Sequence, residues 1–458
     1  MTLNDIFGSI YSMRLSDLIP LTSIQTGEDK RNHKDGYYFI FTESEWEKTY
    51  TMIPATRIFY APLLACTPMV YFNPETYVWL NLMIFPGDSK DSLNNPESVF
   101  RAIQDAEGIA KQGKWESLLF AMPSAIQMEV LYRMMTCAAD ENRRADIYAL
   151  FKAYYPLGDF FTWMLPDDFA LKFMAAKSEA QKEETRKALD SINGDVIRVY
   201  RGTADKSAAP EKALSWSKDI NIAYMFALKA GKHPKILIGD VRKESVLECF
   251  DGKEKEIAVI PGSVNIKKVE NLYDEDSPEV ANSAKAVAPI FAKAKAEIQK
   301  LYADKAGREE GGHDMAHSVR VLAFALILGY LEGLSGTQLR KLAQAAAYHD
   351  VGRDDDGSDY GHGERSAKIY KKAKSFRADS SVAYLIRCHC IPDSKALDMA
   401  ACEMDKKLLC VLKDADALDR LRFGPVGYGD DTLDVLQLRL EHSKKFVYAA
   451  RKLQRGLL

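Results

Sequence analysis

The chain has 458 residues, of which 47% are hydrophobic and 28% are charged. This length predicts roughly three domains, and the composition excludes a disordered chain, a collagen-like chain and a disulfide-rich miniprotein. The 62 Lys and Arg residues nearly balance the 65 Asp and Glu residues, which leaves a net charge of −3. The net charge therefore does not indicate nucleic acid or anionic lipid as a partner, but it does not exclude a local basic patch.

The first twenty residues do not resemble a signal peptide, because no clean apolar run follows a basic segment. No stretch approaches the ~20 apolar residues that span a bilayer, so we expect no membrane insertion. The seven cysteines form no CxxC pair, and we interpret them as reduced thiols. These features predict a cytoplasmic protein, or an effector that is secreted into a host cell without a classical signal peptide.

Three regions with different sequence patterns follow one another along the chain. Residues 1–100 mix aromatic, apolar and Pro-containing pieces, with strands expected at 57–65 and 68–72 and a strand pair at 74–85. From about 96 to 191 apolar residues recur at helical spacing, which predicts helices at 98–112, 124–135 and 143–155. From 195 the period changes to two and predicts short strands at 196–202, 235–241, 245–250 and 256–262.

The polar stretch 271–283, which contains Pro278, predicts a linker. Beyond it the pattern is helical almost to the C-terminus. We therefore expect a multidomain α+β protein. Its predicted parts are an N-terminal region of unknown role (1–100), a mixed α/β region (101–270), the linker (271–283) and a helical domain (284–458).

The helical domain contains His and Asp residues in three short strings. His317 lies in the first, His349 and Asp350 end an apolar helix in the second, and Asp414 lies in the third. His362 and His389 lie between the last two strings. Imidazole and carboxylate ligands suit Mn, Mg, Fe, Zn or Co, and ligands on separate helices can surround a cation in a bundle. His313 could contact substrate or lie on the helix surface.

The strings HSVRV, YHDVGR and KDADALDRLR, in this order, resemble the HD-domain metal-dependent phosphohydrolases over residues 285–450. The resemblance implies an all-α bundle, a divalent metal, Asp350 as a catalytic residue and a nucleotide or phosphoester substrate. It also implies the metal ligands His317, His349, Asp350 and Asp414, with His362 and His389 at a second metal position. Arg353 stands where the family usually has Lys, and no GYP element follows His389, which disfavours a cyclic dinucleotide substrate.

The middle region contains a second set of polar residues. Arg201 and Gly202 end a predicted strand, where Arg suits phosphate binding and Gly permits close backbone approach. Ser215 and Ser217 precede a predicted helix with Asp219 as its N-cap. Two glutamates, separated by one residue, would point to the same face of a strand and could engage a ribose hydroxyl; they are Glu254 and Glu256.

In this order the strings YRG, SWS and E-x-E resemble the Arg-Ser-Glu class of mono-ADP-ribosyltransferases over residues 195–270, with preceding helices from about 115. The resemblance implies a β-sandwich with helices and NAD as the cofactor. It implies an NAD site formed by Arg201, Gly202, Ser215 and Ser217. Glu256 would be catalytic, and Glu254 would accompany arginine-directed transfer. Trp216 stands where the family often has Thr.

Together the two resemblances favour a toxin-like or effector-like mono-ADP-ribosyltransferase that uses NAD to modify a protein acceptor, with Arg as the first guess. The HD module would hydrolyse a nucleotide or an ADP-ribose phosphoester. Three alternatives stay open: an HD phosphohydrolase with a regulatory NAD- or nucleotide-binding module, an NAD glycohydrolase, and a scaffold. The sequence does not identify the acceptor, the HD substrate, the metal or the oligomeric state.

Overall fold

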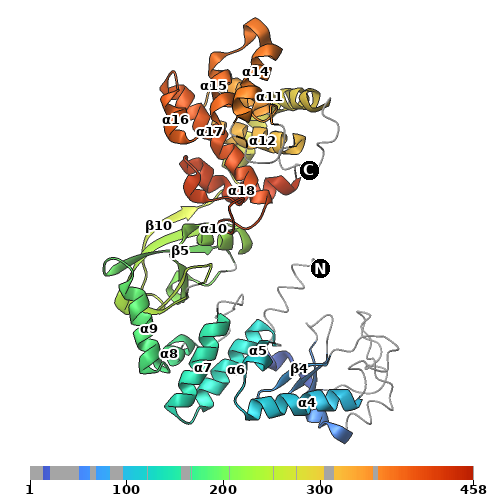
Figure 1. Ribbon diagram of the computed structural model, residues 1–458, viewed down its shortest axis with the longest axis vertical. Coiled ribbons are helices and arrows are strands. Elements are labelled where there is room, and N and C mark those ends of the chain that lie inside the picture. The colour runs from blue at the N-terminus through green and yellow to red at the C-terminus, as the bar shows by residue number, and fades with distance from the viewer. Residues whose placement is uncertain are drawn as a thin grey trace. The chain divides into compact units, whose positions relative to one another are not determined.

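The computed structural model comprises two compact units, Met1–Ser191 and Ile192–Leu458, shown as a ribbon in Figure 1. The structure describes residues 14–20, 51–61, 69–82, 96–120, 122–155, 166, 168–205, 207–250, 252–274, 276–303, 314–353, 359 and 361–456. The first unit contains residues from two of the four predicted parts. The second unit combines residues 192–270 with the predicted linker and helical domain. The division into four functional parts stays a prediction.

The first unit contains a four-stranded antiparallel sheet in the order β1-β2-β3-β4. Its strands are β1 (Ile19–Pro20), β2 (Ile58–Tyr60), β3 (Met69–Phe72) and β4 (Trp79–Asn81). Glu107 of the following helix accepts hydrogen bonds from Tyr71 (2.8 Å), Asn73 (2.7 Å) and Thr76 (3.0 Å), which hold that helix on the sheet. Strands were expected in all three segments that form β2, β3 and β4.

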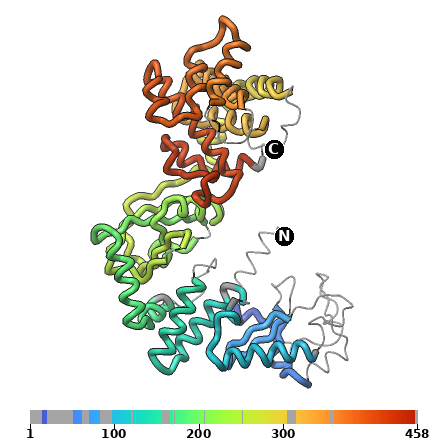
Figure 2. The backbone as a smooth tube through the Cα atoms, viewed as in Figure 1, coloured from blue at the N-terminus to red at the C-terminus, as the bar shows by residue number. Residues whose placement is uncertain are grey.

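Within the described residues of the first unit, helices follow the sheet along the chain, and Figure 2 shows their backbone trace. They are α4 (Pro96–Lys111), α5 (Glu116–Phe120), α6 (Ser124–Cys137), α7 (Glu141–Tyr154), α8 (Phe169–Ala175) and α9 (Glu179–Asp190). Aromatic stacking joins two of them, because the rings of Phe151 in α7 and Phe173 in α8 lie 4.4 Å apart. The helical spacing of apolar residues correctly predicted α4, α6 and α7.

The second unit begins with a six-stranded antiparallel sheet in the order β10-β7-β5-β6-β9-β8. Its strands are β5 (Val196–Thr203), β6 (Ser215–Ser217), β7 (Lys235–Arg242), β8 (Val246–Cys249), β9 (Glu256–Val259) and β10 (Asn265–Asn271). The described strands of the second unit form one hydrogen-bonded sheet, and the expected sandwich stays a prediction. Its two halves are joined through one residue pair, Tyr200 with Ser217.

Helix α10 (Ile220–Lys229) lies against β5 (Figure 1). As predicted, Asp219 caps it, since its carboxylate accepts a hydrogen bond from Asn221 N at 2.9 Å. Gly202 permits the close approach of the helix to the strand. A Cβ at this position would lie 1.8 Å from the carbonyl oxygen of Ala223, so any larger residue would push α10 away.

The stretch expected to be a linker is built into the second unit. Strand β10 runs to Asn271, and Leu272, which follows it, is buried and donates its backbone N–H to Pro234 O at 2.9 Å. Tyr273 N donates to Lys445 O at 2.8 Å, and a long helix already begins at Pro278. The segment therefore connects the sheet to the bundle through specific contacts.

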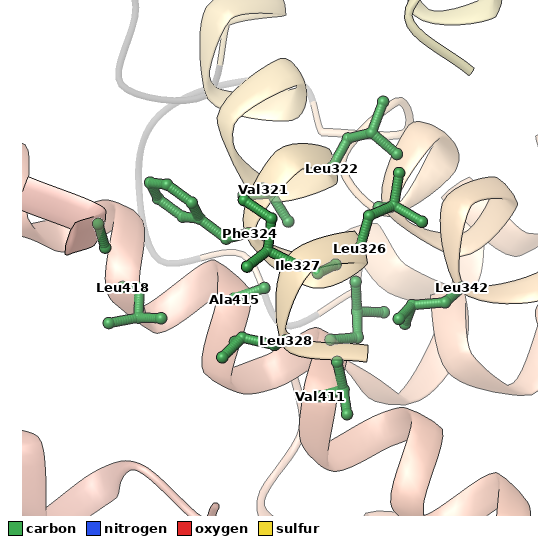
Figure 3. Packing of buried hydrophobic residues seen from close by; sticks show 14 of the residues in the cluster. Val321, Leu322, Phe324, Leu326, Ile327, Leu328, Leu342, Val411, Ala415 and Leu418 are labelled. Carbon is green, nitrogen blue, oxygen red and sulfur yellow. The ribbon is translucent and has the colours of Figure 1, made fainter. Parts of the chain in front are cut away.

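The described residues of the second unit that follow β10 are mainly helical, as expected for residues 284–458. These helices are α11 (Pro278–Ala303), α12 (Met315–Leu331), α13 (Gly336–Tyr348), α14 (His362–Lys374), α15 (Ser380–Cys388), α16 (Asp393–Asp398), α17 (Glu403–Asp419) and α18 (Glu441–Gly456). Every residue of α12 from 317 to 329 is buried, which identifies it as the central helix. Figure 3 shows α12 side chains packed against residues of α13 and α17, among them Leu342, Val411 and Leu418.

The sheet and the bundle share one hydrophobic core, because Ile222 and Tyr224 of α10 belong to the same buried cluster as the bundle residues. Asn221 bridges the two parts with both ends of its amide. Its Nδ2 donates to Asp434 Oδ1 at 2.9 Å, and its Oδ1 accepts from Val435 N at 2.9 Å. Among the described residues, no helix combines the length and apolar character needed to cross a bilayer.

We predict that Asn221→Ala lowers the free energy of unfolding by about 1–3 kcal/mol, because the buried N–H of Val435 and the carboxylate of Asp434 each lose a partner. Chemical denaturation followed by circular dichroism measures this change. The exposed Asn193→Ala is the matched control and should change stability by less than about 0.5 kcal/mol. Equal effects of the two substitutions would contradict a structural role for the Asn221 bridge.

Candidate metal centre

Four buried histidines converge where the ends of several bundle helices meet. His317 lies in the first turn of α12, and His349 directly follows α13. His362 begins α14, and His389 directly follows α15. All four are at most 7% exposed. His313 lies outside the described residues.

The first pair of imidazoles consists of His317 and His349, whose Nε2 atoms lie 3.1 Å apart. Asp416 completes this group, with its Oδ1 at 3.3 Å from His317 Nε2 and 4.0 Å from His349 Nε2. One ligand atom from each of the three residues lies within 4.8 Å of the others. We name His317, His349 and Asp416 the first group.

The second pair consists of His362 and His389, whose Nε2 atoms lie 2.9 Å apart. Cys390 lies beside them, and its Sγ and one ligand atom from each imidazole lie within 4.8 Å of one another. We name His362, His389 and Cys390 the second group. The sequence suggested the two histidines here, whereas all seven cysteines were interpreted as reduced thiols.

Asp350 lies between the two groups and directs one carboxylate oxygen to each. Its Oδ2 lies 3.5 Å from His317 Nε2 and 3.7 Å from His349 Nε2. Its Oδ1 lies 3.1 Å from His362 Nε2 and 3.2 Å from His389 Nε2. The structure therefore brings together five of the six residues that we predicted as ligands.

Hydrogen bonds at Nδ1 fix the orientation of each imidazole. Nδ1 of His349 faces Ala346 O at 2.8 Å, and Nδ1 of His389 faces Ile386 O at 2.7 Å. Carbonyl oxygens only accept, so both Nδ1 atoms donate. His362 Nδ1 likewise donates to the carbonyl oxygen of Asp359, and His317 Nδ1 donates to Oδ2 of the ionised Asp419 carboxylate at 2.8 Å. In the neutral tautomers all four Nε2 lone pairs then point inward.

This arrangement fits a divalent metal. Two lone pairs facing each other at about 3 Å repel unless a proton or a cation lies between them. Burial lowers the pKa of His349 to about 4, which keeps this imidazole neutral and able to bind a cation. Burial also opposes charge on His362, but the hydrogen bond to Asp350 outweighs it and raises the pKa to about 10. Protons and a cation therefore compete for the same inward positions.

Asp414 does not join this site, which corrects the prediction that it binds metal. Its buried carboxylate accepts hydrogen bonds from Arg439 N, Leu440 N and Arg439 Nη1 at 2.9–3.1 Å. Asp416, two residues later in α17, faces the histidines instead, because residues two apart on a helix differ in direction by about 200°. Asp414 thus anchors the segment before α18, and Asp416 is the candidate ligand that the sequence reasoning missed.

Asp419 is a further residue that the sequence analysis missed. It is fully buried, accepts from His317 Nδ1 and receives Arg320 Nε at 2.6 Å and Arg320 Nη2 at 3.1 Å. A carboxylate behind a metal-binding imidazole fixes the ring and raises its basicity. The spacing of Asp416 and Asp419, three residues apart on one helix face, was the available signal.

The second predicted set, apart from Glu254, lies on three neighbouring strands, β5, β6 and β9. Arg201 Nη1 donates to Ser215 O at 2.5 Å, and Gly202 adjoins Arg201 on β5 beneath α10. Ser217 pairs with Glu256 across β6 and β9, and both side chains are buried. The predicted residues on these strands, which are separate in the sequence, therefore lie next to one another across the sheet.

Glu254 does not share a strand with Glu256, which corrects the same-face argument. Strand β9 begins at Glu256, and Glu254 lies in the preceding turn, where Lys255 has a positive φ of 46°. The backbone carbonyl of Glu254 accepts the hydroxyl of Ser217 at 2.6 Å. The alternation rule of strands therefore does not apply to this pair.

Comparison with known proteins supports one of the two resemblances. Residues 315–421 match the family model of the HD domain. This range includes α12 to α17 and with them both metal-ligand groups, so the match indicates a metal-dependent phosphohydrolase domain. No curated protein and no solved structure matches the chain. The HD match does not extend to residues 195–270.

The two aspartates of α17 should respond differently to substitution. We expect Asp416→Asn to weaken metal binding by about tenfold or more with little loss of stability, because it removes a ligand from a partly exposed position. Asp414→Asn should instead lower the midpoint of thermal unfolding, because it removes the charge that Arg439 faces in the interior. Calorimetric metal titration and thermal unfolding separate these outcomes. Loss of metal binding in Asp414→Asn alone would restore the original assignment.

Proposed function

We propose that the helical part of the second unit hydrolyses a phosphoester or phosphoanhydride bond of a nucleotide with the help of divalent metal. The observation that supports this proposal most directly is the position of Asp350 between two imidazole pairs. Each pair has its Nε2 atoms directed to one carboxylate oxygen. Two adjacent cation positions that share a carboxylate suit the displacement of an oxygen at phosphorus.

A divalent cation held here would polarise a phosphoryl oxygen and lower the pKa of a coordinated water. The chain itself orients the four imidazoles through their Nδ1 acceptors and places Arg353 Nε 3.8 Å from Asp350 Oδ2. Arg353 keeps the positive charge of the family's Lys, and its planar guanidinium group can donate two hydrogen bonds to phosphate oxygens. Asp416 has 34% of its side chain exposed and the other site carboxylate, Asp350, only 3%, so substrate approaches past Asp416.

Phosphate release from a panel of nucleoside phosphates and ADP-ribose, with the full chain loaded with Mn²⁺ or Co²⁺, tests this proposal. We expect His349→Asn to reduce kcat/KM by about 100-fold or more, because it removes an inward nitrogen of the first group. His233→Asn is the matched control, since this exposed histidine lies outside the metal centre. Unchanged phosphate release in His349→Asn would contradict the assignment.

As a second candidate we propose that residues 195–270 bind NAD and transfer ADP-ribose to a protein acceptor, with an Arg side chain as the first guess. The row of Arg201, Ser215, Ser217 and Glu256 across neighbouring strands supports it. A carboxylate held beside a serine on the next strand can engage a ribose hydroxyl. The two competing hypotheses for this region are NAD hydrolysis and NAD or nucleotide binding that regulates the HD part.

Incubation of the full chain with labelled NAD and a lysate separates these hypotheses. We expect labelled protein with the wild type and a loss of about 100-fold or more with Glu256→Gln, because the carboxylate charge at the ribose is lost. Glu244→Gln, at an exposed site, is the matched control. Release of nicotinamide without labelled protein would indicate the glycohydrolase, and binding without turnover would indicate a regulatory module. Absence of NAD binding would contradict every NAD role.

A further inference from the structure

The two groups of the metal centre differ in ligand chemistry. The first group combines two imidazoles with the carboxylate of Asp416, and the second combines two imidazoles with the thiol of Cys390. Asp350 adds one oxygen to each. The first position therefore offers two nitrogens and two oxygens, and the second offers two nitrogens, one oxygen and one sulfur.

The backbone of α14 makes room for the sulfur. A Cβ built at Gly363 would lie 2.8 Å from Cys390 Sγ and 2.6 Å from Arg387 O. Glycine directly after His362 therefore lets the end of α15 approach α14 closely enough for the thiol to reach the imidazoles. A side chain at this position would displace the sulfur from the second group.

The neighbouring cysteine shows that the position of Cys390 is specific. Cys388, the last residue of α15, is fully buried and belongs to the hydrophobic core of the bundle. Cys390, two residues later, is only partly buried and lies with His362 and His389. The two cysteines that flank His389 in the sequence thus differ, because one thiol lies in the core and the other lies at the site.

We propose that Cys390 is a metal ligand and that the second group is a soft cation site, selective for Zn²⁺, Co²⁺ or Fe²⁺ over Mg²⁺ and Mn²⁺. This inference rests on the proposed metal-dependent function of the bundle. Thiolate ligands select softer ions, whereas carboxylates also suit hard ones. Two imidazoles, one thiolate and one carboxylate are four ligands of types that zinc binds, and four is the number found in closed zinc sites. The first group, which includes the partly exposed Asp416, keeps the open side for substrate.

Titration of the metal-free full chain with Co²⁺ tests the proposal by spectroscopy. The wild type should show a sulfur-to-cobalt charge-transfer band in the near ultraviolet and bind about two ions per chain. Cys390→Ser should lose this band, keep visible cobalt absorption from the first group and bind about one ion. Cys402→Ser, at an exposed cysteine, is the matched control and should behave as the wild type.

A second measurement needs no variant, so it tests the proposal even if the Cys390→Ser chain fails to fold. Iodoacetamide should alkylate Cys390 in the metal-free wild type, and Co²⁺ should protect it, while exposed Cys402 reacts in both states as an internal reference. Peptide mass spectrometry quantifies both sites.

The outcomes distinguish the two proposals. Bound cobalt without the charge-transfer band, or without protection of Cys390, overturns the thiolate ligand and leaves the proposed hydrolase intact. A band that persists in Cys390→Ser likewise overturns the assignment of the sulfur. Failure of the wild type to bind cobalt, together with no phosphate release, overturns both.

Discussion

The carboxylate of Asp350 is the feature on which the metal centre depends. It is nearly buried, and a buried carboxylate is costly unless positive charge or hydrogen-bond donors surround it. Here the inward nitrogens of four imidazoles occupy both of its sides, with Arg353 beside one oxygen. Because the histidines come from four different helix ends, a cation shared around Asp350 would hold α12, α13, α14 and α15 in one arrangement. The geometry of the centre and the packing of the helix ends therefore stabilise each other.

The core beneath the centre keeps these helix ends in place. Helix α12 is buried along almost its whole length, so the position of His317 follows from packing rather than from a surface helix. The same core includes α10, which lies against β5, the strand that carries Arg201. The two predicted chemistries consequently belong to one compact unit, although a change in composition along the sequence suggested a linker between them.

Local sequence patterns predicted most helices and strands correctly. The features that they did not predict are determined by tertiary packing. Apolar periodicity correctly indicated β5, β7 and the helices of the bundle, and the short His and Asp strings indicated five residues that the structure brings together. The choice between Asp414 and Asp416 depended on which face of α17 meets α12, and the three-residue spacing of Asp416 and Asp419 was the local signal for that face. The linker was predicted from polar residues at 271–283, but Leu272 enters the core there. Glu254 was misplaced because the first residue of a strand is poorly defined by sequence.

The ends of the helices explain how the imidazoles of the candidate metal centre are oriented. The last carbonyls of a helix have no partner within the helix. His349 and His389 each follow a helix directly and donate Nδ1 to the carbonyl three residues earlier, Ala346 O and Ile386 O. His362 uses the same three-residue relation to Asp359 O before α14. The hydrogen bond from Nδ1 to the carbonyl three residues earlier thus gives that carbonyl a partner. It also fixes the tautomer of the imidazole and directs Nε2 toward Asp350. The lengths of α13 and α15 therefore set the direction of the ligands, since one added residue would rotate each imidazole by about 100° away from the carboxylate.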